Sequence, residues 1–230
     1  MSVVDYLSEF LASLAPHQVA LVVAAATASL LVIEERRLSL LPLLIQYLPV
    51  DPLASSRFYR PVIFARIGLG VAVCLILYVT ARHVQRELDR LVRLLSDENK
   101  ISHVPVERRL PSASLTGMGL IFRLMLVALG GLIAFGMWRT YPLATIPVRI
   151  NLTGYWLISI GLLLTLTSVD PLRMGFGVLT FVNGFEGIYL CLEQSLVVIG
   201  LLGVLNILVA LGVATCSESW LESLRAETSG

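Results

Sequence analysis

The chain has 230 residues, of which 57% are hydrophobic and 14% are charged, with 17 basic against 16 acidic side chains. An average soluble domain carries about 25% charged residues, so this composition excludes a water-exposed globular surface, and it equally excludes a disordered chain. A net charge of +1 argues against nucleic-acid binding. The composition therefore predicts an all-α protein in the lipid bilayer, a polytopic transmembrane helical bundle.

Seven apolar segments have the length of a transmembrane helix, which is about 20 residues. The second segment contains Pro42, Pro49 and Pro52, and it is either a short kinked span or an interfacial segment. We expect a span; the interfacial alternative would leave a bundle of six. The predicted spans are 16–33, 38–55, 61–82, 117–138, 151–168, 171–191 and 195–216.

Residues 83–116 form a basic segment between the third and fourth spans. Its apolar residues recur at the spacing of one face of a helix: Val84, Leu88, Leu91 and Leu95. Two interpretations are open. The helix either lies at the lipid headgroups, anchored by its arginines, or docks a peripheral cytoplasmic subunit. The predicted docking residues are Arg86, Arg90 and Arg93.

The distribution of positive charge predicts the orientation of the bundle. The stretch 82–116 contains seven Lys and Arg residues, so we expect this stretch and the C-terminus in the cytoplasm and the N-terminus outside. The expected location is a bacterial plasma membrane or an internal energy-converting membrane. The predicted parts are an N-terminal transmembrane unit at 1–82, the basic cytoplasmic loop at 83–116, a C-terminal transmembrane unit at 117–216 and a short tail at 217–230.

Polar side chains inside the spans are the candidate functional residues, because a charge at the bilayer centre costs about 2.5–3.5 kcal/mol on insertion scales. Glu186 is the only carboxylate well inside a span. It is a proton-relay group, a structural partner of an arginine, or a residue near a water-filled edge. Arg66 and Arg123 either snorkel to the interface or pair with an acid on another helix. Asn183 and Asn206 either bond between helices or form a polar track with Glu186.

Several chemistries are absent from the sequence. Cys74, Cys191 and Cys216 form no CxxC pair and are expected to be buried apolar residues. No histidine lies in the middle of a span, and the motifs of zinc proteases, P-loop NTPases and serine hydrolases are missing. We therefore expect no cofactor, no metal site and no catalytic constellation in this chain.

The last three spans carry a family likeness. The runs DPLRMGFG at 170–177 and LTFVNGFE at 179–186 resemble the second helix of the K-type small membrane subunit of respiratory complex I, and GVLNILVAL at 203–211 resembles its third helix. The related subunits of membrane-bound hydrogenases and Mrp antiporters are similar. The resemblance covers 151–216 and implies that these three helices pack against a large antiporter-like membrane subunit.

The resemblance also implies which residues would carry protons. The family is expected to use one glutamate in each of these two helices, at the positions of Leu179 and Asn206. Glu186, two turns after Leu179, would stand in. The expected function is that of an integral subunit of a complex I-like, hydrogenase-like or antiporter-like assembly that supports proton or cation translocation without its own redox centre. The alternatives are a purely structural or assembly protein of a bacterial membrane complex, or a small independent transporter.

Overall fold

The computed structural model describes residues 16–33, 38–47, 60–99, 119–143, 146–192 and 195–229, and its regular structure within these ranges is helical throughout. The all-α prediction is confirmed. Five helices, α4 to α8, are long and apolar enough to cross a membrane, and α2 is apolar but shorter. The described helices are α2 (Pro16–Val32), α3 (Leu40–Gln46), α4 (Arg60–Asn99), α5 (Leu120–Thr140), α6 (Val148–Thr167), α7 (Pro171–Leu192) and α8 (Leu196–Ser229).

The expected second span differs from the structure in its described part. Helix α3 has seven residues, which at about 1.5 Å per residue cover roughly 10 Å, a third of the hydrocarbon core. Pro42 lies in its first turn, where the missing N–H breaks no intrahelical bond, and the helix ends at Tyr47, two residues before Pro49. Helix α3 alone is therefore too short to span, and residues 48–55 of the prediction lie outside the described residues.

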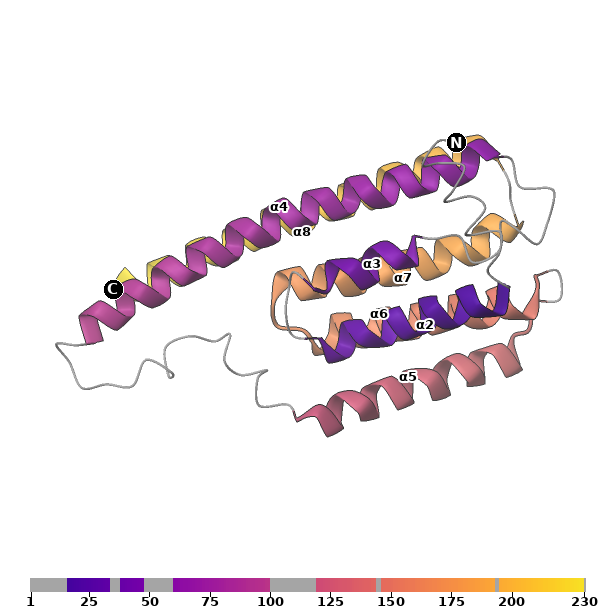
Figure 1. Cartoon of the computed structure of the whole chain (residues 1–230), viewed down its shortest axis with the longest axis horizontal. Helices are drawn as coiled ribbons and strands as arrows, with labels where there is room; N and C mark the ends of the chain where they lie inside the picture. The colour runs from indigo at the N-terminus through magenta and orange to yellow at the C-terminus, as the bar shows by residue number, and fades with distance from the viewer. Residues whose placement is uncertain are drawn as a thin grey trace.

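The described part of the basic segment, residues 83–99, is helical as expected, but it does not begin a new helix. Helix α4 continues from the third span to Asn99, about 60 Å in all, and Figure 1 shows it extending with α8 beyond the other helices. Val84 is 1% exposed and belongs to the same core cluster as Trp220 and Leu221 of α8. The helix is thus continuous with the third span and packs on α8.

Helices α6 and α7 form an antiparallel hairpin with the closest backbone approach in the described bundle. A Cβ atom on Gly161 would lie 2.5 Å from the backbone nitrogen of Phe181, and one on Gly184 would lie 2.8 Å from the carbonyl oxygen of Gly154. Small residues at these positions let the two backbones touch, as is common between membrane helices. Helices α2 and α5 pack on α6, and helices α3 and α8 pack on α7.

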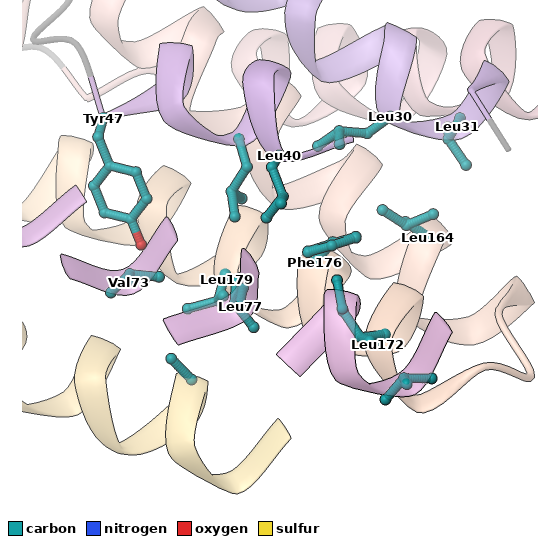
Figure 2. Close-up of a cluster of buried hydrophobic side chains, with 14 of the residues drawn as sticks. Leu30, Leu31, Leu40, Tyr47, Val73, Leu77, Leu164, Leu172, Phe176 and Leu179 are labelled. Carbon is teal, nitrogen blue, oxygen red and sulfur yellow. The ribbon is translucent and has the colours of Figure 1, made fainter. Parts of the chain in front are cut away.

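The main core cluster joins helices from both ends of the chain. Figure 2 shows Leu30 of α2, Leu40 and Tyr47 of the α3 segment, Val73 of α4 and Leu179 of α7 in one apolar group. The opposite faces of the outer helices are apolar and exposed; Ile121 of α5 is 76% exposed and Val197 of α8 is 79% exposed. Such faces suit lipid tails or the apolar helices of another subunit.

Candidate functional site

A chain of buried polar side chains connects three helices in the middle of the bundle. The Asn206 side chain on α8 donates from Nδ2 to Oε2 of Glu186 on α7 over 3.0 Å. The Tyr47 hydroxyl, at the end of α3, donates to Oδ1 of Asn206 over 3.2 Å. All three residues are at most 1% exposed. We call these three residues the polar triad.

The orientation of the Asn206 amide follows from its neighbours. Its Nδ2 faces two acceptors, Glu186 Oε2 and the backbone oxygen of Leu202 at 3.1 Å, while its Oδ1 faces the Tyr47 hydroxyl. Reversing the amide would set oxygen against oxygen at both acceptors. Both amide hydrogens and the amide oxygen of Asn206 are thus satisfied within the protein.

A close approach of α3 and α4 brings Tyr47 to the triad. A Cβ atom on Gly70 of α4 would lie 2.6 Å from the Cβ of Tyr47, so only glycine leaves room for the tyrosine here. Arg66 lies one turn before Gly70 on α4. The Nε of Arg66 is buried and forms no hydrogen bond with any described residue.

Two further buried amides lie on the elements that form the triad. Asn183 precedes Glu186 by one turn on α7, and Gln46 precedes Tyr47 on α3; each side chain is 1% exposed. Neither amide forms a hydrogen bond with a described residue through its nitrogen or its oxygen. Helix α3 packs directly on α7. The predicted polar track is therefore joined between Glu186 and Asn206, whereas Asn183 is buried near it but not bonded to it.

The Glu186 carboxylate lacks a cationic partner in the described part of the chain. Its hydrogen bond is to a neutral amide, and neither Arg66 nor Arg123 forms an ion pair with it. A buried carboxylate has lone pairs for about four hydrogen bonds and is costly to leave charged without compensation. The described part of the chain thus gives this carboxylate one hydrogen bond, from a neutral amide.

Arg123 occupies a different place from the triad. Its side chain is 7% exposed, and its NH1 donates to the carbonyl oxygen of Val32 over 2.9 Å. Arg173 of α7 donates to the next carbonyl, that of Ile33, over 2.8 Å. The last carbonyls of a helix carry partial negative charge, which two guanidinium groups stabilise. Arg123 and Arg173 therefore hold the C-terminal end of α2 against α5 and α7.

A small cavity lies beside these two arginines. It has a volume of about 20 Å³, enough for about one water molecule. Apolar side chains and two hydroxyl groups share its wall, which is formed by Leu31, Arg123, Leu126, Leu164, Thr167, Ser168 and Arg173.

The predicted docking arginines lie on the extension of α4. Arg86 and Arg90 are exposed, and Arg90 pairs with Glu87 over 3.0 Å. Arg93 belongs to the same helix, but its side chain lies outside the described part, as do Lys100, Arg108 and Arg109 of the basic loop. The position of the exposed arginines, beyond the ends of the shorter helices, leaves them available to a partner.

The cysteines differ in exposure, and the described side chains that could bind a metal do not cluster. Cys74 and Cys191 are partly buried and Cys216 is exposed, so the expectation of three buried cysteines is too strong for Cys216. Across the described ranges, no three His, Cys, Asp or Glu side chains gather as metal ligands would.

Sequence reasoning found Glu186 and Asn206 but missed Tyr47 and Gln46. Both lie in the proline-rich second segment, where a tyrosine is typical of the membrane interface.

Comparison with known proteins adds no homologue, because no family model, curated protein or solved structure matches this chain.

Proposed function

We propose that this chain is an integral membrane subunit of a complex I-like, hydrogenase-like or Mrp antiporter-like assembly, in which Glu186 exchanges a proton. The observation that carries the proposal is the burial of this carboxylate without a cationic partner among the described residues. It is 1% exposed, it is bonded to the neutral amide of Asn206, and no described cation pairs with it. Residues of this kind inside membrane helices usually belong to ion or proton pathways.

The arrangement of the last three helices supports the resemblance to the K-type subunit. Helices α6, α7 and α8 follow one another through short connections and pack in that order. Leu179 and Asn206, at the family's two acidic positions, are both 0% exposed, and Glu186 is 1% exposed. Glu186 thus faces the same interior as the family's glutamates would, and we infer that it takes over their role without any redox centre in this chain.

The exposed surfaces support a place within a larger assembly. The outer faces of α5 and of α8 up to Leu211 expose apolar side chains, and they would receive lipid or a large antiporter-like membrane subunit. The extension of α4, with Arg86 and Arg90 exposed, would meet a peripheral cytoplasmic subunit. From the distribution of positive charge we infer that this extension and the C-terminus lie on the cytoplasmic side of the membrane. The membrane would be a bacterial plasma membrane or an internal energy-converting membrane.

The test replaces Glu186 by glutamine in the host and follows proton translocation in membrane vesicles with a pH-sensitive dye. Glutamine keeps the size of the side chain and can still accept from Asn206, but it cannot release a proton. Glu218→Gln, at an exposed carboxylate of α8, is the matched control. We expect Glu186→Gln to lower proton translocation at unchanged protein level and Glu218→Gln to leave it unchanged. Normal translocation in the Glu186 variant would refute the proposal.

A structural role is the second candidate, and the triad itself favours it. Its two hydrogen bonds join α3, α7 and α8, which are distant in sequence. Under a purely structural or assembly function, Glu186→Gln would reduce the amount of assembled protein, while the activity per assembled complex would stay at the wild-type value.

A further inference from the structure

Two buried amides beside the triad have a hydrogen-bonding capacity that the described protein does not fill. Gln46 and Asn183 are each 1% exposed, and both their amide nitrogens and both their amide oxygens are without partners. More than nine in ten buried polar groups in proteins are hydrogen-bonded to protein or to ordered water. An unfilled amide on each of two helices that pack together therefore points to a ligand between them.

The chemistry of the unfilled groups identifies the class of ligand. The amide nitrogens are donors and the amide oxygens are acceptors. A metal cation would satisfy the oxygens only. An anion would satisfy the donors only. Water is the small ligand that both donates and accepts.

We propose that the interface of α3 and α7 binds internal water molecules between Gln46 and Asn183. Asn183 and Glu186 are one turn apart on α7, so their side chains emerge on the same side of the helix. Water held by Asn183 therefore lies within reach of the carboxylate. It gives Glu186 a hydrogen-bonded connection to α3 that does not pass through Asn206.

The proposal extends the proton-exchanging role of Glu186 but does not need it. Buried waters of this kind typically make about three hydrogen bonds each. Two buried amides on helices that pack together, each with a free donor and a free acceptor, offer enough partners to hold such waters. The site is built from α3 together with α7, so it includes a part of the chain outside the K-like helices.

Solid-state NMR of the full-length, isotopically labelled protein in lipid bilayers tests the site directly. The experiment measures magnetisation transfer from water to each side-chain amide, assigned through the residue's own backbone signals, so that no variant is required. Asn206 is the internal control, because its amide is buried but is filled by Tyr47, Glu186 and Leu202. We expect transfer to Asn183 and Gln46 to be several-fold faster than transfer to Asn206.

Two results would overturn the proposal. Equally slow transfer to all three amides would mean that the interface of α3 and α7 is dry. A shift of the Asn183 and Gln46 signals when choline replaces Na⁺ and K⁺ in the buffer would identify a cation as the ligand instead. Failure here is separable from failure of the proposed function, because the translocation assay of Glu186→Gln does not depend on where water binds.

Discussion

Replacing Asn206 by leucine is expected to destabilise the protein more than any other single change in the triad. Leucine has the same branched arrangement of heavy atoms as asparagine but neither donates nor accepts a hydrogen bond. The change removes the bond of 3.2 Å from Tyr47 and the bond of 3.0 Å to Glu186 together. It therefore leaves two buried polar groups without their partner at once.

The magnitude follows from what each group loses. A buried polar group without a partner costs about 1–3 kcal/mol, whereas hydrogen bonds between membrane helices couple by about 0.6 kcal/mol on average and by at most about 1.7. We therefore expect Asn206→Leu to lower the free energy of unfolding by about 2–4 kcal/mol. Tyr47→Phe removes one bond only, and we expect a loss of about 0.6–1.7 kcal/mol.

A double-mutant cycle measures the coupling. The wild type, Tyr47→Phe, Asn206→Leu and the double variant are unfolded reversibly with sodium dodecyl sulfate in mixed micelles, and the fluorescence of the three tryptophans reports unfolding. In the Asn206→Leu background, Tyr47→Phe should cost nothing further or should stabilise, because the hydroxyl has already lost its acceptor. An equal cost of Tyr47→Phe in both backgrounds would refute the hydrogen bond and with it the triad.

Three further predictions test the packing, the arginine contact and the orientation. Gly161→Ala should cost about 1–3 kcal/mol, because its Cβ would lie 2.5 Å from a backbone nitrogen of α7, while Gly187→Ala, which meets nothing within 4 Å, should be neutral or stabilising in the same titration. Arg123→Leu should lower stability by about 1.5–3 kcal/mol through loss of its bond to the last carbonyl of α2, and exposed Arg139→Leu should change it by less than about 0.5; equal losses would contradict the contact. A fluorescent protein fused to the C-terminus should fluoresce and a periplasmic phosphatase fused there should be inactive, and the opposite pattern would reverse the predicted orientation.

Part of the site could be predicted from the sequence because polar residues stand out in apolar runs. Glu186 and Asn206 each interrupt a long apolar segment, so both were recognisable as candidates. Their contact with each other was not, since α7 and α8 each have several possible rotations about their axes. Tyr47 could not be predicted for a different reason, because its segment is short and rich in proline. Its position in the triad also depends on the space left by Gly70, a glycine 23 positions later in the chain.

The sequence contains an indication that α4 continues beyond the membrane span, although the change in hydrophobic pattern pointed the other way. Neither glycine nor proline occurs from residue 71 to 104, so nothing in that stretch stops a helix. The change from an apolar to an amphipathic pattern near Arg82 suggested two separate helices instead. The structure shows what the apolar face packs against: Val84 and Leu221 of α8, more than half of the chain apart, belong to one buried cluster.

The contacts of Arg123 illustrate a limit of the same kind. Its depth in the span predicted either snorkelling or an acidic partner, since those are the usual solutions for a buried cation. The structure adds a partner of a third kind, the carbonyl of Val32 at the end of α2, to which Arg123 donates. Helix ends supply acceptors that carry no formal charge, so a search for acidic residues in the sequence does not find them.

The measurement that tests the central claim most directly is purification of the tagged chain from its own host in a mild detergent, followed by mass spectrometry of the proteins that accompany it. A subunit of an energy-converting assembly should recover antiporter-like or hydrogenase-like membrane subunits in stoichiometric amounts, and their yield should survive Glu186→Gln. Recovery of the chain alone, as a monomer or homo-oligomer, would contradict the account.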